Sequence, residues 1–175
     1  MLRISTVLFI STILLISCNN TNNSNNTVTL EQISSLEKEL FSSENLSLDM
    51  AKAKHLAELY IEFAKTHPQD QLSPEFLYKA SDIYMNLNYP KQALALYDDI
   101  LTKYPSYKNN PTIMFLKGFV YDDQLKDYDN ARVCYENFLE KYPESEFADD
   151  AIISLNNLGK SPEEMIKEFE LKNNE

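Results

Sequence analysis

The stretch "ILTKYP", residues 100–105, decides the fold because it returns as "FLEKYP" at 138–143 and, more loosely, as "FAKTHP" at 63–68. The prolines that close these three segments are 37 and 38 residues apart. Proline has no backbone N–H and disfavours helix in the residue before it, so each segment predicts the end of a helix. Because the same helix end recurs at a nearly constant interval, the sequence predicts a chain of repeated units.

The two later units align along their whole length when one residue is inserted near Lys126. Aligning residues 74–105 with 111–143 pairs alanines, tyrosines and the closing Lys-Tyr-Pro: Tyr84 with Tyr121, Tyr89 with Tyr128, Ala93 with Ala131, Tyr97 with Tyr135, and 103–105 with 141–143. A small alanine lets one helix of a pair approach the other closely, while tyrosines fill the space between neighbouring pairs. Each unit is therefore predicted to be a pair of helices.

Composition favours helices throughout the chain. Only two glycines occur, whereas an all-β sandwich or a nucleotide-binding loop would need many more for its turns and close backbone approaches. Apolar residues also recur at helical spacing in two consecutive runs: Leu77, Ala80, Ile83, Tyr84 and Leu87, then Ala93, Leu96, Tyr97, Ile100 and Leu101. The expected fold class is all-α.

Boundary residues give the expected extent of each helix. Ser73, Asn110 and Ser161 each precede a proline and are predicted to cap the helix that follows. Ser161 and Glu164 also have the spacing of a capping box, and Gly159 is predicted to end its helix. The expected pairs are 29–41 with 48–66, 74–87 with 90–104, 111–124 with 129–142, and 145–158 with 161–172.

The two central units resemble the tetratricopeptide repeat, which has Leu-Gly-x-x-Tyr in its first helix, Ala-x-x-x-Tyr/Phe in its second and a proline after it. The later unit fits with Gly118, Tyr121, Ala131, Tyr135 and Pro143. The earlier unit fits with Tyr84, Ala93, Tyr97 and Pro105, and has Ser81 in the glycine place. The resemblance implies antiparallel helix pairs stacked as a short right-handed α-solenoid over residues 29–172.

Three features depart from the family pattern. Ile100 and Phe138 stand where the family usually has a small alanine, and the period exceeds about 34 residues. Long periods and Tyr-Pro ends followed by segments such as "SEFADDA", residues 145–151, look like the tetratricopeptide-repeat lipoproteins of bacterial envelopes. Those include the lipoprotein of the outer-membrane barrel assembly machine and the repeat partner of the Tol-Pal system.

Residues 1–17 have the layout of a secretory signal peptide. Arg3 is their only charge, and the apolar run that follows is shorter than the roughly 20 residues of a membrane span. Leu15-Ile16-Ser17-Cys18 resembles the bacterial lipobox, which implies diacylation of the Cys18 sulfur, cleavage after Ser17 and acylation of the new amino group. An uncleaved anchor helix and a signal cut elsewhere are the alternatives.

Residues 18–28 are predicted to be a lipidated flexible tether. They are polar, uncharged and almost free of apolar side chains, so they cannot bury enough surface to offset the entropy of ordering. Asn19 is not the aspartate that retains lipoproteins in the inner membrane of the best-studied bacteria. By that analogy, the expected location is the periplasmic face of the outer membrane.

Little in the sequence points to catalysis, a cofactor or nucleic acid. Sixteen basic against 27 acidic side chains give a formal net charge of −11, which leaves no basic patch for phosphates. His55 and His67 lack ligand partners at metal-binding spacing, and Cys134 is expected to be a buried, inert thiol. The acidic doublets lack calcium-loop spacing, so no metal, no cofactor and no enzymatic activity are predicted.

A protein-binding groove is the remaining candidate site. In tetratricopeptide arrays the first helices of successive pairs line a concave surface, and the family's groove positions fall here on Tyr78, Asp82, Met85, Asn86, Phe115, Phe119, Asp122 and Asp123. Phe115 and Phe119 are expected to form an aromatic ridge rimmed by carboxylates, which would suit an apolar or basic segment of an envelope protein. The alternative is that Phe119 only packs against the next helix.

The expected function is a non-enzymatic, outer-membrane-anchored scaffold for envelope assembly or maintenance. A helper of cell-wall or division machinery is a variant of the same class. A small-ligand or glycan-binding lipoprotein is the alternative from another class, and the absence of tryptophan weakens it.

Overall fold

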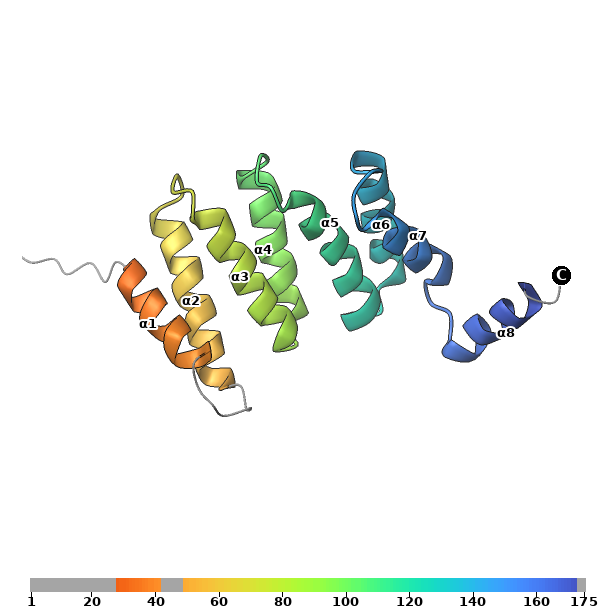
Figure 1. The fold of residues 1–175 in the computed structure, drawn as a ribbon, viewed down its shortest axis with the longest axis horizontal. Helices are drawn as coiled ribbons and strands as arrows, with labels where there is room; N and C mark the ends of the chain where they lie inside the picture. Colours follow the sequence, from red (N-terminus) through yellow and green to blue (C-terminus); the bar gives the residue numbers. More distant parts are fainter. Residues whose placement is uncertain (1–27, 42–48, 173–175) are drawn as a thin grey trace, which may run out of the picture.

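The computed structural model describes residues 28–41 and 49–172, and all the regular structure in these ranges is helical. The predicted all-α repeat solenoid is confirmed (Figure 1). In chain order the elements are α1 (Leu30–Phe41), α2 (Met50–Thr66), α3 (Ser73–Asn86), α4 (Pro90–Lys103), α5 (Asn110–Phe119), the π-helix η1 (Val120–Gln124), α6 (Tyr128–Lys141), α7 (Ala148–Asn157) and α8 (Pro162–Lys172). The proposed signal peptide, Cys18 and most of the tether lie outside the described residues.

Helices that follow one another in sequence are neighbours in the stack from α1 to α7 (Figure 1). The second helix of each of the first three pairs contributes a tyrosine to the core at the same position: Tyr60, Tyr97 and Tyr135, each almost fully buried. Ala93 and Ala131, the predicted close-approach positions, are also fully buried. The first pair therefore follows the same core pattern as the two central pairs, although its sequence matches the repeat motif poorly.

The turn between consecutive pairs has the same hydrogen bonds three times. The N–H groups of His67, Tyr104 and Tyr142 each donate to the carbonyl four residues earlier, at 2.8 Å. Three residues further on, Asp70, Tyr107 and Ser145 donate to those capping residues in turn. Because the third copy of this turn runs from Tyr142 through Phe147, α7 begins at Ala148 rather than at the predicted residue 145.

Ser73 and Asn110 do not cap their own helices, contrary to the prediction. Both side chains are buried and bond backward: Ser73 Oγ donates to the His67 carbonyl at 2.6 Å, and Asn110 Nδ2 donates to the Tyr104 carbonyl at 2.9 Å. These bonds satisfy carbonyls that the end of the preceding helix leaves open. The predicted capping box is confirmed, since the Ser161 N–H donates to Glu164 Oε2 at 2.8 Å and the Glu164 N–H donates to Ser161 Oγ at 3.2 Å.

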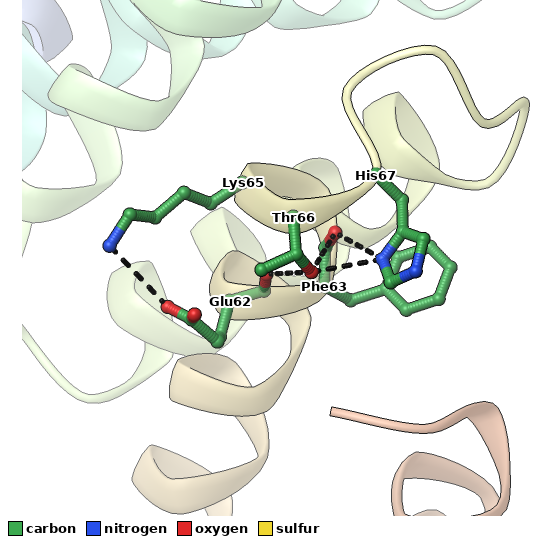
Figure 2. A network of polar contacts seen from close by, with 5 residues as sticks. All are labelled: Glu62, Phe63, Lys65, Thr66 and His67. Atoms are coloured by element: carbon green, nitrogen blue, oxygen red, sulfur yellow. Dashed lines mark hydrogen bonds and ion pairs between the residues drawn. The ribbon is translucent and has the colours of Figure 1, made fainter. Parts of the chain in front are cut away.

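Figure 2 shows the end of α2, where one of these turns begins. Thr66 Oγ1 donates to the Glu62 carbonyl at 2.8 Å, and His67 Nδ1 lies 2.9 Å from Thr66 Oγ1 and 3.2 Å from the Phe63 carbonyl. The His67 ring stacks on the Phe63 ring with centroids 4.5 Å apart. Lys65 forms an ion pair with Glu62 one turn back. His67 closes the helix through its ring stacking and its hydrogen bonds.

The inserted residue of the later unit lies in the π-helix η1. In the earlier unit the Tyr89 N–H donates to the Tyr84 carbonyl, whereas in the later unit the Asp127 N–H donates across one more residue to the Tyr121 carbonyl, both at 2.8 Å. A π-turn takes up one extra residue without breaking the helix. This geometry makes Asp127 the equivalent of Tyr89, so the predicted pairing of Tyr89 with Tyr128 is wrong by one residue.

The predicted closing pair is not formed. Helix α7 packs against α6. In contrast, α8 extends away from the stack (Figure 1), and none of its described side chains is buried. Gly159, with φ 74°, lies in the turn that redirects the chain. Among the described helices, none combines the length and apolarity needed to cross a bilayer.

Candidate functional site

The predicted groove residues on α3 lie in different environments. The Tyr97 hydroxyl donates to Met85 Sδ at 2.8 Å, so Met85 belongs to the packed interior of its own pair. The Tyr78 ring packs edge-on against Tyr107 with centroids 6.5 Å apart, and burial raises the pKa of its hydroxyl. Asp82 and Asn86, one turn apart, instead line an open cavity.

The aromatic ridge predicted for the third pair is not formed. Phe115 stacks on Phe147 with centroids 5.0 Å apart and an interplanar angle of 10°, and it also contacts Tyr135 and Phe138 at 5.8 Å. Phe147, in the turn before α7, thus covers one side of Phe115, which is half-buried and packs against the core. Phe119 is exposed, with 37 % of its surface accessible. It forms no ridge with Phe115, because the Phe115 ring is stacked on Phe147.

The two carboxylates predicted to rim that ridge also differ. Asp122 is half-buried in η1, and burial raises the pKa of its carboxyl against the opposing effect of Lys126. Asp123 is exposed, with its carboxylate 3.6 Å from Lys126 Nζ. The structure therefore brings together only the α3 part of the predicted groove, around Asp82 and Asn86.

The cavity lies between α1, α2 and α3 and has a volume of about 370 Å³. Its lining combines apolar side chains with a few polar ones: Glu37, Leu40 and Phe41 from α1, Ala53 and Tyr60 from α2, and Lys79, Asp82, Ile83, Asn86 and Leu87 from α3 and its C-cap. Both α1 and α3 are first helices of their pairs, so the cavity opens between successive first helices. That is the position in which the family's groove was expected.

A polar network holds the wall of the cavity together. Glu37 accepts hydrogen bonds from the Tyr60 hydroxyl at 2.5 Å and from Lys79 Nζ at 2.9 Å, which ties α1 to α2 and α3. Lys79 Nζ also lies 5.5 Å from the centroid of the Tyr60 ring. Burial acts to raise the pKa of Glu37, but these two hydrogen bonds and the charge of Lys79 lower it overall. The Glu37 carboxylate is thus ionised, and the charge of Lys79 and the two hydrogen bonds compensate its burial.

Asp82 has no comparable compensation. Burial and, secondarily, the negative charge of Glu75 raise the pKa of its carboxyl to about 6. None of the ion pairs found within residues 28–41 and 49–172 includes Asp82, and Lys79, one turn earlier, is already bonded to Glu37. A half-buried carboxylate with a raised pKa, beside a cavity, marks a candidate functional site.

The structure also describes Cys134 and the acidic and histidine side chains that the sequence raised as possible reactive or metal-binding groups. Cys134 is half-buried rather than fully buried, and burial raises the pKa of its thiol, so it is a poor nucleophile. In the described part of the chain, no three His, Cys, Asp or Glu side chains gather where they could hold a metal ion.

Comparison with known proteins identifies the two central pairs. Residues 75–107 and 113–145 each match the family model of the tetratricopeptide repeat. These segments take in α3 with α4 and α5 with α6, so the two central helix pairs of the α-solenoid are similar to tetratricopeptide repeats. Repeats of this family mediate protein–protein interaction. No curated protein matches the chain.

Sequence reasoning missed the α1 wall of the cavity. The groove positions follow from the alignment of the repeat units, and the first pair matches the repeat motif too poorly for this alignment to reach Glu37 or Phe41. Their i, i+4 spacing does place them on one face of a helix, and this was the available signal. The alignment could not say which residues of α3 that face would meet.

Proposed function

We propose that the protein is a non-enzymatic, lipid-anchored scaffold that binds envelope proteins at the periplasmic face of the outer membrane. The observation that carries the scaffold role is the match of two consecutive helix pairs to a family of interaction repeats. A stack of short helix pairs presents a continuous surface on which a partner segment can lie. The anchor rests on the lipobox resemblance of residues 15–18 and on the polar segment that follows.

Cys18→Ala tests the anchor. The variant should lose labelling by radioactive palmitate and remain as an uncleaved or mislocalised precursor, because its lipobox has no other sulfur to modify. Cys134→Ala is the matched control and should be labelled like the wild type. Continued labelling of the Cys18→Ala protein would exclude the proposed anchor.

Crosslinking in intact envelopes, followed by mass spectrometry, tests the scaffold role. The wild type should yield defined envelope proteins with crosslinks on the first helices of the pairs. Separation of inner and outer membranes before analysis tests the location. If the protein crosslinks only to lipids or to itself, the scaffold proposal fails.

A small-ligand-binding lipoprotein is the second candidate, and the cavity is the observation that favours it. A volume of about 370 Å³ with an apolar lining and a few polar groups lies near the lower end of small-molecule sites. Mass spectrometry of protein purified under native conditions would decide: a co-purifying compound that leaves on Phe41→Ala substitution favours this candidate.

A further inference from the structure

We propose that the cavity between α1, α2 and α3 is the docking site for a protein segment that carries a lysine or arginine beside a large apolar side chain. Asp82 would bind the cation, and the apolar lining would take the neighbouring side chain. This inference rests on the proposed scaffold role and gives that role a place in the fold and a partner chemistry.

The apolar part of the site is built from two helices. Leu40 and Phe41 come from α1, and Ile83 and Leu87 face them from α3 and its C-cap. Phe41 leaves 71 % of its surface exposed at the edge of the cavity. Covering an exposed aromatic ring beside a preformed hollow is a typical source of binding energy at protein interfaces.

The charged part of the site is Asp82. Its carboxylate is half-buried and lacks an ion-pair partner among the described residues, because the nearest lysine along α3, Lys79, is bonded to Glu37. A partner cation would supply the missing charge in this half-buried position, and such complementarity sets specificity. An acidic segment would instead meet Asp82 and Glu75 together and be repelled.

A second copy of this chain is a poor occupant. The projecting helix α8 has exposed apolar residues at Met165 and Ile166, but it carries four glutamates and two lysines. The whole chain has a formal net charge of −11, so two copies repel one another. Charge therefore favours a different protein as the source of the basic segment.

Binding should also depend on pH. A bound cation stabilises the ionised form of Asp82, so its affinity should fall as the pH drops below the raised pKa of about 6. The titratable groups around this carboxyl or on the cavity wall come from four helices: Glu37 on α1, Tyr60 on α2, Glu75, Tyr78 and Lys79 on α3, and Tyr97 on α4. Glu37 has a lowered pKa and the tyrosines raised ones, so Asp82 is the group among them whose shift falls near pH 6.

The test uses the full-length protein in detergent micelles and a phage-displayed library of random 12-residue peptides. At pH 7.5 and low salt, the enriched peptides should carry Lys or Arg next to Leu, Met or Phe. The most enriched peptide is then synthesised with its cation intact and with norleucine in that place. Fluorescence anisotropy should show at least tenfold weaker binding of the norleucine peptide, and weaker binding of the intact peptide at pH 5 than at pH 7.5.

Variants locate the site. Asp82→Asn and Phe41→Ala should each weaken the intact peptide at least tenfold, whereas Asp129→Asn, on the exposed face of α6, should not change its affinity. The double variant Asp122→Asn with Asp123→Asn should also bind normally. Circular dichroism confirms that each variant is folded. Enrichment of acidic peptides, recovery of no peptide, or unchanged affinity in folded Asp82→Asn would each overturn the proposal.

The same variants separate this inference from the scaffold role. If Asp82→Asn and Phe41→Ala crosslink to the same envelope proteins as the wild type, the scaffold role stands and its contact surface lies elsewhere. If the peptide binds at the cavity but the wild type crosslinks to no envelope protein, the docking site stands and the scaffold role fails.

Discussion

The ring of Tyr135 occupies the space that a side chain at position 118 would fill. A Cβ atom added to Gly118 would lie 2.6 Å from two carbon atoms of this ring, closer than real Cβ atoms approach. Tyr135 is fully buried between α5 and α6, so its ring cannot move aside cheaply. The glycine of the repeat motif is thus needed here for close helix packing, although it lies inside a helix.

Gly118→Ala should therefore destabilise the protein. Alanine is favoured over glycine in a helix by about 1 kcal/mol, but overpacking a core typically costs about 1–3 kcal/mol. We expect a net loss in the free energy of unfolding, measured by urea denaturation followed by circular dichroism. Ser81→Ala, at the equivalent position of the second pair, removes volume and should cost less. A Gly118→Ala protein as stable as the wild type would show that Tyr135 repacks freely.

The buried alanines of the second helices offer a related test. Ala93→Leu and Ala131→Leu should each lower the free energy of unfolding by about 1–3 kcal/mol, because both positions are fully buried between paired helices. Ala95→Leu, at an exposed position of the same helix as Ala93, should stay within about 0.5 kcal/mol of the wild type. Thermal unfolding of the three variants makes the comparison. Equal effects at Ala93 and Ala95 would contradict the observed orientation of α4.

Removal of α8 should leave the stack intact. Its described side chains are not buried, and the ion pair that Glu168 makes with Lys160 is exposed and worth little. A chain that stops after Lys160 should unfold within a few degrees of the full-length protein. A chain that stops before Phe147 loses the ring that stacks on Phe115 and should unfold at a clearly lower temperature. Equal loss in both would mean that α8 contributes to the core.

The core of the stack could be predicted from the sequence because the repeat alignment pairs the positions that are buried in each unit. Tyr97 and Tyr135 occupy equivalent buried positions, and one insertion near Lys126 was enough to find them. The structure places the extra residue in a π-turn just before Lys126. Local periodicity and repeated helix ends thus determined helix number, extent and pairing for the three main pairs.

The site was only half predictable, because it depends on contacts between units. Phe115 had the sequence pattern of a groove residue, but a ring 32 positions later, Phe147, covers it. Ser73 looked like a helix cap, yet the closest open acceptor was the carbonyl of the preceding helix end at His67. Asp82, one of the predicted groove residues, lines the cavity, whereas the opposite wall on α1 has no sequence motif to reveal it.

Asp82→Asn should stabilise the free protein at neutral pH. The folded protein holds the Asp82 proton up to about pH 6, whereas the unfolded chain releases it near 3.8, so folded protein binds more protons between these values and stability falls as the pH rises through them. An asparagine at position 82 does not ionise, so it removes this loss of stability at neutral pH. Allowing for screening by solvent at this half-buried site, the gain in the free energy of unfolding at pH 7.5 should be about 1 kcal/mol.

Urea denaturation at two pH values checks this prediction. At pH 7.5 the Asp82→Asn protein should be more stable than the wild type, and at about pH 3.5, where Asp82 is mostly protonated in both states, the difference should largely vanish. Asp129→Asn, at an exposed position, is the control and should change little at either pH. A variant that is more stable in the free state yet binds the basic peptide more weakly would mean that Asp82 favours binding at the expense of folding. A stability difference that does not depend on pH would mean that the pKa of Asp82 is the same in the folded and the unfolded protein, and that its carboxylate is already compensated.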